Sequence, residues 1–227
     1  MCALLKLQGG FALKNEDVSP VVVKRLPRYY RYLGELLKQN ITRISSKALA
    51  EKMGVTASQI RQDLNCFGGF GQQGYGYNVE ILYNEIGEIL GLSKGYKAII
   101  VGAGHLGHAL ASHPGFAKRG FSTIGIFDVD KKVIGTSVSG LVVRDYADIS
   151  SFIEKNKPDI AILAVPKAVV AEVAHYLADE GIKALWNFAY TDLTLPDGVV
   201  VENVHLSDSL MTLSYRLTQR IIGGEDE

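Results

Sequence analysis

The chain has 227 residues, and its 24 Lys+Arg and 24 Asp+Glu give a formal net charge of zero. That length predicts one or two domains of about 100–200 residues each, and a hydrophobic content of 47% excludes a disordered chain. No apolar run reaches the roughly 18 residues of a membrane span, and the N-terminus lacks the features of a secretory signal. The two cysteines, Cys2 and Cys66, are too few for a disulfide framework or a Cys-only zinc site. A reduced, cytoplasmic protein is therefore expected.

The zero charge is the sum of two stretches of opposite sign. Residues 20–77 hold nine basic and three acidic residues, a net charge of +6, whereas residues 78–227 hold 13 basic and 19 acidic residues, a net charge of −6. Such asymmetry indicates nucleic-acid contact by the basic half, although ordinary solvated helices rich in Lys and Arg would give the same count. Residues 1–18 are expected to be a disordered extension, left over from cloning or from a misassigned start.

The first predicted element of the basic half is an amphipathic helix that begins at Ser19-Pro20 and continues to Asn40. Proline is favoured at the first helical position. A second proline, Pro27, should kink the helix or mark its true start. Apolar residues then recur at three- and four-residue steps, namely Val23, Leu26, Tyr30, Leu33, Leu36 and Leu37.

Two shorter helices follow with the spacing of a helix-turn-helix. Ser45 or Ser46 caps the first, which Gly54 ends, and a capping box that starts at Thr56 opens the second, which runs to about Phe67. Its polar side chains are expected to be exposed and to reach phosphates or base edges; these are Ser58, Gln59, Arg61 and Gln62.

The glycine-rich residues 68–77 come next. Five glycines in ten residues exclude a stable helix there. The alternating aromatic residues Phe70, Tyr75 and Tyr77 favour a short hairpin over a flexible linker, with its tip near residues 72–74. Residues 19–78 are thus predicted to form a winged-helix domain.

A further helix is predicted within residues 79–95. Asn78 caps it and Gly91 ends it, with an apolar face between them. It would connect the two halves of the chain and fix their angle, or it would simply pack in a core. The apolar face comprises Ile81, Leu82, Ile86, Ile89 and Leu90.

Residues 96–206 begin with a dinucleotide-binding pattern. The strand Ala98–Val101 leads directly into Gly102-Ala-Gly104-His-Leu-Gly107 and a helix, which is the context that this motif needs. The glycines allow a tight turn, close approach of the backbone to a pyrophosphate, and close helix–strand packing. Asp128 ends the next strand, 21 residues after Gly107. An acid at this position bonds a ribose 2′-hydroxyl and repels a 2′-phosphate, so NAD(H) is favoured over NADP(H).

Strands and helices continue to alternate after this point, which predicts a doubly wound parallel sheet. Residues 164–166 and 187–189, just past two strands, should face the ligand crevice. A final helix in residues 207–227, before an acidic tail, carries an apolar stripe for its own domain or for a partner subunit. No metal-ligand spacing or evident catalytic acid–base pair is present, which argues against an enzyme.

Together these motifs resemble the Rex family of redox-sensing transcriptional repressors over about residues 19–222. The resemblance implies a homodimer whose winged helices bind palindromic DNA, a C-terminal helix swapped between subunits, and release of DNA by NADH but not by NAD⁺. It is carried, in chain order, by Arg25-Leu-Pro-Arg-Tyr29, Ser45-Ser46, Ser58-Gln-Ile-Arg61, Asp63-Leu64, Phe67-Gly68, Gly74 to Tyr77, Gly102 to Gly107, Phe127-Asp-Val-Asp130, Ala164-Val-Pro166, Gly181-Ile-Lys183, Asn187-Phe-Ala189 and Glu202-Asn-Val204.

Two sets of site residues follow from the motifs and the resemblance. The expected nucleotide site, for NADH or NAD⁺, comprises Gly102, Ala103, Gly104, His105, Leu106, Gly107, His113, Asp128, Val129, Ala164, Val165, Pro166, Asn187 and Phe188. The expected DNA site comprises Arg28, Ser45, Ser46, Lys47, Thr56, Ser58, Gln59, Arg61, Gln62, Gln73, Gly74 and Tyr75. The resemblance also places Arg31 and His205 at a switch contact.

Four positions depart from the pattern of many family members, which have Lys at Gln62, a basic residue at Gln73, Tyr at His113 and Asp at His205. Glutamine reads adenine where lysine favours guanine, so a more A·T-rich operator is expected. A histidine cannot form the acid–arginine bridge that an Asp at position 205 makes with the arginine matching Arg31. The two histidines would instead make the response pH-sensitive near neutrality.

The predicted mechanism is a population shift. A dimer would hold two recognition helices about 34–36 Å apart, and NADH would favour a closed arrangement that breaks this spacing. Two rivals stay open: an NAD-dependent dehydrogenase with a helical cap domain, and a structural domain that binds CoA or another nucleotide.

Overall fold

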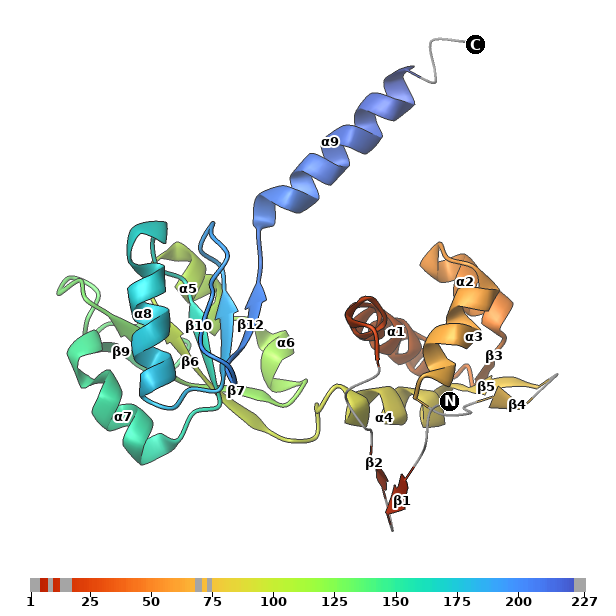
Figure 1. The fold of residues 1–227 in the computed structure, drawn as a ribbon, viewed down its shortest axis with the longest axis horizontal. Helices are drawn as coiled ribbons and strands as arrows, with labels where there is room; N and C mark the ends of the chain where they lie inside the picture. Colours follow the sequence, from red (N-terminus) through yellow and green to blue (C-terminus); the bar gives the residue numbers. More distant parts are fainter. Residues whose placement is uncertain (1–4, 8–9, 13–17, 68–70, 73–74, 223–227) are drawn as a thin grey trace. The chain divides into compact units, whose positions relative to one another are not determined.

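The structure is a computed structural model that describes residues 5–7, 10–12, 18–67, 71–72 and 75–222. It contains two compact units, Met1–Ser93 and Lys94–Glu227, each of which is described by itself (Figure 1). In the part of the chain that is described, no helix has both the length and the apolar character needed to cross a membrane.

The first unit is a helical bundle with a small three-stranded sheet. The sheet has the order β3-β5-β4, with β3 (Arg43–Ile44), β5 (Gly76–Asn78) and β4 (Gly71–Gln72) all antiparallel. The helices are α1 (Pro20–Lys38), α2 (Ser46–Met53), α3 (Ala57–Asn65) and α4 (Val79–Ile89). The strands β4 and β5 confirm the predicted hairpin, and α2 and α3 confirm the predicted helix-turn-helix.

Side-chain caps fix where the shorter helices start. Ser45, Thr56 and Asn78 each accept a hydrogen bond of 2.9–3.1 Å from the backbone N–H three residues further on. Gly54 ends α2 at a φ of 65°, a left-handed conformation that glycine adopts without steric cost. The capping box is only half formed, because the side chain of Gln59 does not return to Thr56 but bonds to Asp63.

The buried faces of two helices differ from the expectation by one or two positions. On α1, Val22 and Tyr29 are buried, whereas Val23 is exposed. The helix starts at Pro20 and continues through Pro27, which is therefore not its beginning. On α4, Val79 is buried and Ile81 is exposed. These buried residues of α1 and α4 belong to one core, so α4 packs within the first unit.

Within residues 1–18, Leu5–Leu7 (β1) and Gly10–Ala12 (β2) pair as antiparallel strands. The expected disorder of this segment stays a prediction.

The second unit is built on a seven-stranded sheet of order β12-β11-β10-β6-β7-β9-β8. Every pair is parallel except β8–β9, which confirms the predicted α/β class. The antiparallel edge strand β8 was not predicted. The strands are β6 (Tyr96–Val101), β7 (Phe121–Asp128), β8 (Ser137–Val138), β9 (Leu141–Asp145), β10 (Ile160–Leu163), β11 (Ala184–Asn187) and β12 (Val200–Asn203).

Helices cover both faces of this sheet, as in a doubly wound fold. On one face Ile153 of α7 (Ile149–Asn156) and Val170 of α8 (Lys167–Asp179) pack into one core. Leu110 of α5 (His105–Ala111) packs against the core of the other face. Ala109 of the same helix is exposed. The short helix α6 (Pro114–Ala117) and the 3₁₀ turn η1 (Tyr146–Asp148) complete the unit.

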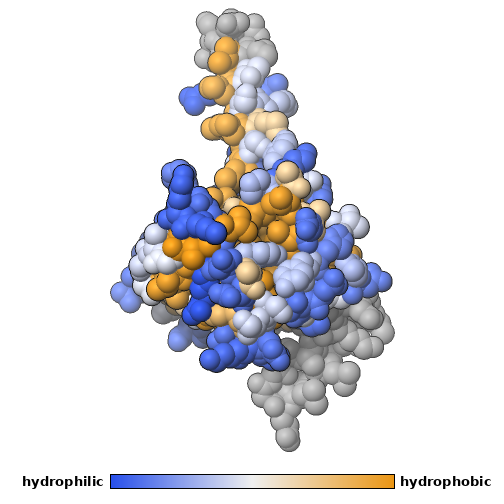
Figure 2. All heavy atoms as spheres, turned by 90° about the vertical axis from the view of Figure 1, so that its left-hand side faces the viewer, coloured by the Kyte–Doolittle hydropathy of each residue, from blue (hydrophilic) through white to orange (hydrophobic). Residues whose placement is uncertain are grey.

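The last helix, α9 (Leu206–Ile222), exposes its apolar residues to solvent. Leu210, Leu213 and Leu217 are 57–66% exposed. Figure 2 shows the apolar side chains aligned along this projecting helix. A stripe of this kind on one helix is typical of an interface.

Candidate functional site

The glycine-rich loop between β6 and α5 is built for close backbone approach. Gly102 has a φ of 101°, and a Cβ there would collide with the carbonyl group of Ala164, while a Cβ on Gly107 would collide with the carbonyl oxygen of Gly102. A Cβ on Gly104, in contrast, would meet nothing within 4 Å. Two glycines therefore allow the loop to fold, and the third leaves the space that a pyrophosphate would occupy.

Asp128 at the end of β7 holds this loop in place. Its Oδ2 accepts a 2.6 Å hydrogen bond from the backbone N–H of Ala103, and its Oδ1 accepts one of 2.8 Å from the N–H of Asp130. Each carboxylate oxygen has a further lone pair for a ribose hydroxyl. The residues at this point therefore fit the adenosine half of a dinucleotide.

A cavity of about 850 Å³ opens beside the loop. Its size is within the range of small-molecule sites. It brings together a subset of the predicted nucleotide residues: Gly102, Gly104, Asp128, Val129, Ala164, Val165 and Pro166. The remaining lining residues were not predicted and are Val101, Tyr146, Val169, Glu172, Val173 and Tyr176. Four of these lie on α8 at the three- and four-residue steps of one helix face, a signal that the sequence does contain.

Other predicted nucleotide residues do not line this cavity. Ala103 is buried, whereas His105 is exposed, with Leu106 and Gly107 beside it on α5. Phe188 packs against the sheet core at a ring distance of 4.7 Å from Trp186.

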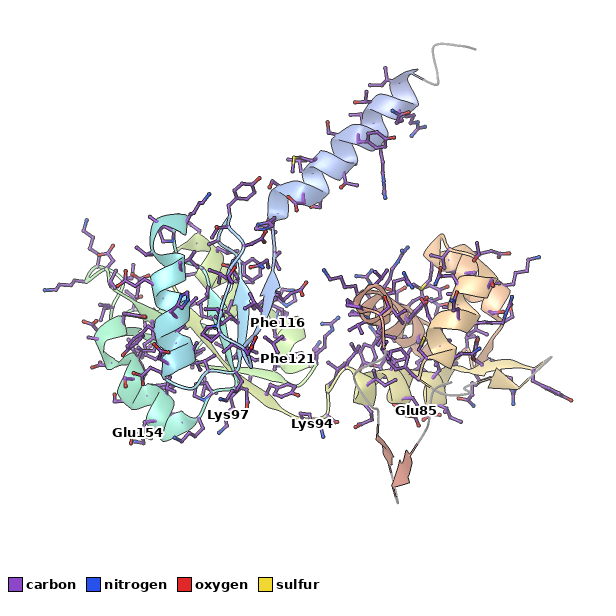
Figure 3. The ribbon with its side chains drawn as sticks, in the orientation of Figure 1. Glu85, Lys94, Lys97, Phe116, Phe121 and Glu154 are labelled. Atoms are coloured by element: carbon purple, nitrogen blue, oxygen red, sulfur yellow. The ribbon has the colours of Figure 1, made fainter. Side chains whose placement is uncertain are left out.

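His113 lies at the start of α6. Its Nδ1 accepts a 3.1 Å hydrogen bond from the N–H of Gly115, and its ring stacks on Phe116 at 4.5 Å. Phe116 is labelled in Figure 3. Its ring in turn meets the edge of the Trp186 ring at 5.5 Å. These contacts place His113 in a small aromatic cluster, and its role in nucleotide binding stays a prediction.

The side chain of Asn187, a residue expected to face the crevice, does not line this cavity, and its role in nucleotide binding stays a prediction. This side chain is fully buried. Its Nδ2 donates hydrogen bonds of 2.8 Å to Thr191 O and Asn203 Oδ1, and its Oδ1 accepts one of 2.9 Å from the N–H of Ala189. Asn187 therefore ties the loop after β11 to β12, because a buried amide must satisfy its polar atoms internally.

The predicted DNA residues of α3 fall into two groups. Ser58, Arg61 and Gln62 are exposed, and Arg61 Nη1 donates a 3.1 Å hydrogen bond to Ser46 Oγ, which links α3 to the start of α2. Gln59, also expected to be exposed, instead turns inward, and its Nε2 donates a 2.8 Å hydrogen bond to Asp63. Four other predicted positions, on α1 and α2 and at the N-caps of α2 and α3, are exposed, namely Arg28, Ser45, Lys47 and Thr56.

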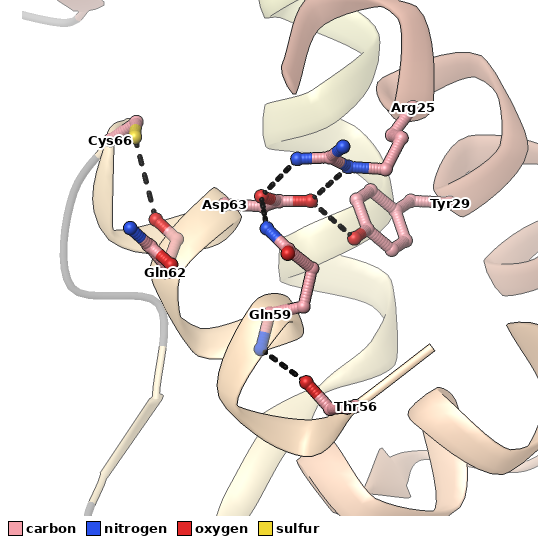
Figure 4. A network of polar contacts seen from close by, with 7 residues as sticks. All are labelled: Arg25, Tyr29, Thr56, Gln59, Gln62, Asp63 and Cys66. Atoms are coloured by element: carbon pink, nitrogen blue, oxygen red, sulfur yellow. Dashed lines mark hydrogen bonds and ion pairs between the residues drawn. The ribbon is translucent and has the colours of Figure 1, made fainter. Parts of the chain in front are cut away.

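A buried acid network joins α3 to α1 (Figure 4). Asp63 is 0% exposed and accepts from Arg25 Nε and Nη2 at 2.6 and 2.7 Å, from the Tyr29 hydroxyl at 2.6 Å and from Gln59. Burial alone would raise the pKa of Asp63, but these hydrogen bonds and the charge of Arg25 outweigh it and leave the pKa below its usual value. The network fixes the recognition helix to the body of the first unit, and no pattern in the sequence predicted it.

The described part of the wing carries a second contact that was not predicted. Arg43 Nη1 donates a 3.3 Å hydrogen bond to the carbonyl oxygen of Tyr75, and the guanidinium lies 6.0 Å from the centre of the Tyr75 ring. Tyr75 is 69% exposed. The predicted contacts Gln73 and Gly74 lie outside the described residues.

The two predicted switch residues belong to different units. Arg31 is exposed on α1. His205 Nε2 lies 3.1 Å from Asp192 Oδ1, and the His205 ring meets the edge of Tyr190 at 5.3 Å. The contact between Arg31 and His205 stays a prediction. Over the described ranges, no group of three or more His, Cys, Asp or Glu residues could hold a metal ion.

Two family models match the chain. One is described as "Putative DNA-binding protein N-terminus" and matches residues 17–65, and the other is described as "CoA binding domain" and matches residues 93–191. The chain is 57% identical over 206 residues to the redox-sensing transcriptional repressor Rex of Thermoanaerobacter pseudethanolicus, an alignment that covers 91% of this chain and 92% of that one.

Solved structures agree with this similarity. A crystal structure of RSP with NAD⁺ and operator DNA is 56% identical, with a TM-score of 0.85, and the match covers 92% of this chain and 96% of that one. A structure of RSP with NADH is 52% identical, with a TM-score of 0.86, and covers 94% and 100%. Because the sequence identity extends over both units, the chain belongs to the Rex family of redox-sensing transcriptional repressors.

Proposed function

We propose that this chain is a transcriptional repressor that binds a palindromic operator as a homodimer and leaves it when NADH binds. One observation carries the proposal: the same chain combines a basic helix-turn-helix with a cavity beside the glycine-rich loop. Asp128 lines this cavity and bonds to the loop. Relatives with this combination have been crystallised with NADH, and with NAD⁺ and operator DNA.

In this proposal the Gly102–Gly107 loop holds the pyrophosphate and Asp128 holds the adenosine ribose. The nicotinamide supplies only a difference in charge between its oxidised and reduced forms, and no hydride is transferred. Among the residues that line the cavity, the only charged side chains are Asp128 and Glu172. The cavity thus lacks a cation for the extra phosphate of NADP(H) or CoA, which favours an unphosphorylated dinucleotide over both.

The dimer would form in part through α9. Its apolar stripe is exposed along the helix, and apolar area left in water costs about 25 cal/mol per Å². A second copy of the chain that covers this stripe would remove that cost. The chain would act in the reducing cytoplasm, where its operator DNA and the NADH pool are both accessible.

Fluorescence anisotropy on a labelled palindromic operator tests the whole proposal. We expect NADH to weaken operator binding by about tenfold or more, a coupling within the usual allosteric range, and NAD⁺ to leave it largely unchanged. Equal effects of both nucleotides would favour a structural nucleotide-binding domain. Consumption of NADH with a small substrate, without DNA affinity, would favour a dehydrogenase.

The exposed Gln62 gives a separate prediction about base preference. Glutamine pairs with adenine in the major groove, whereas lysine pairs with guanine. Gln62→Lys is therefore expected to shift the preferred base from A to G at one position per half-site, by about 1–3 kcal/mol. Selection from a randomised palindrome library measures this shift. As a control, Asn65→Lys adds the same charge to another exposed position of α3 and should strengthen binding without changing the preferred base. If Gln62→Lys and the native chain preferred the same base, Gln62 would not be the residue that reads it.

A further inference from the structure

We infer that Glu172 selects the base of the dinucleotide by accepting a hydrogen bond from the exocyclic amine of adenine. The inference rests on the proposed function, because it assigns one more residue of the same cavity. It starts from the order of the sheet strands, which determines where the base must lie.

Strands β6, β7 and β9 are neighbours in the sheet. The glycine loop follows β6, Asp128 ends β7, and Tyr146 follows β9, and all three contribute to the same cavity. With its pyrophosphate at the loop and its ribose at Asp128, a dinucleotide would place its base further along this row of strands, toward Val129 and Tyr146. The opposite wall there is α8.

The α8 wall is apolar and aromatic except at one position. Val169, Val173 and Tyr176 line the cavity, and the Tyr176 ring lies 6.1 Å from the ring of Tyr146, which also lines it. Such surfaces suit the faces of a purine ring. Glu172 lies on the same face of α8 and is the one acid among these wall residues.

Glu172 has no hydrogen-bond or ion-pair partner within the described part of the chain, whereas Glu180, the C-cap residue of α8, accepts a 2.6 Å hydrogen bond from Ser150. Its charge also acts on the cavity. Burial raises the pKa of Tyr146, and Tyr176 and the negative charges of Glu172 and Glu180 raise it further. The carboxylate of Glu172 lines the same cavity as Tyr146 and is available to a ligand.

A carboxylate can only accept hydrogen bonds. The amine at position 6 of adenine donates, whereas hypoxanthine carries an oxygen acceptor at the same position. Glu172 would therefore favour adenine and disfavour hypoxanthine. Glutamine at this position keeps the size of the side chain but offers both a donor and an acceptor, so Glu172→Gln should accept either base.

The test compares direct binding of NADH and of reduced nicotinamide hypoxanthine dinucleotide, followed by nicotinamide fluorescence. We expect the native chain to prefer NADH by about tenfold, the strength of one charge-assisted hydrogen bond, and Glu172→Gln to reduce the preference to about twofold or less. Asp179→Asn removes an exposed acid of the same helix outside the cavity and should keep the native preference.

The outcomes separate the two proposals. Equal binding of both dinucleotides by the native chain, or an unchanged preference in Glu172→Gln, would overturn the role of Glu172 and leave the proposed function intact. Binding of neither dinucleotide by the natively folded chain would overturn both. Circular dichroism of each variant establishes that it is folded.

Discussion

Replacing Asp63 by alanine is expected to lower the free energy of unfolding of the first unit by about 3 kcal/mol, because breaking a buried ion pair leaves its partners without compensation. The hydroxyl of Tyr29 is fully buried and would lose its acceptor. The side chain of Arg25 is 26% exposed, so water would restore part of its hydrogen bonding. Operator affinity should fall as well, because the network joins α3 to α1.

Denaturant unfolding followed by circular dichroism measures this loss. Asp63→Asn retains an acceptor oxygen and should lose less stability, and Glu51→Ala, at an exposed position of α2, should lose almost none. If Asp63→Ala unfolded at the same denaturant concentration as Glu51→Ala, the network would contribute no stability.

The same carboxylate predicts a pH dependence with a definite sign. The pKa of Asp63 in the folded chain is lowered, so its contribution is fully present above the unfolded value of about 3.9 and is lost as the pH falls through the folded value. The stability of the native chain should therefore decline more steeply below about pH 4 than that of Asp63→Asn. Parallel declines would contradict this linkage.

The second large effect is expected on α9. Leu213→Asp combined with Leu217→Asp places two charges in the exposed apolar stripe and should convert the proposed dimer to a monomer. Each monomer would then bind one half-site, and loss of the second attachment should weaken operator binding by about 100-fold or more. Analytical ultracentrifugation and anisotropy on the full palindrome measure the two effects.

A matched pair of substitutions controls for added charge. Ser214→Asp with Gln219→Asp introduces the same charges at exposed polar positions of α9 and should leave a dimer with only a modest loss of affinity. If the leucine variant also remained a dimer with native affinity, α9 would not be the interface. Far-ultraviolet circular dichroism distinguishes dissociation from unfolding.

Patterns that depend on neighbouring residues in the sequence predicted the fold well. The loop from Gly102 to Gly107 and the acid at Asp128 lie where the motif placed them, because strand, turn and helix are specified within about 30 residues. The caps at Ser45, Thr56 and Asn78 are confirmed for the same reason.

Features that depend on distant residues could not be predicted in this way. Gln59 turns inward because Asp63 is buried, and Asp63 can be buried because Arg25 is 38 positions away in the sequence and adjacent in space. On α1, apolar residues occupy both members of the pairs Val22–Val23 and Tyr29–Tyr30, so periodicity alone could not decide which member of each pair packs inward. Tertiary contacts made that choice.

The two backbone hydrogen bonds of Asp128 have a consequence for redesign of the cleft. A single carboxylate holds the loop through Ala103 and is also the group that would meet the ribose. Replacing it by a small or basic residue to admit a 2′-phosphate would release the loop at the same time, and affinity for every dinucleotide would fall. A cofactor swap in this protein therefore needs an acceptor kept at position 128, such as asparagine, with the new cation placed at Val129, which is 75% exposed.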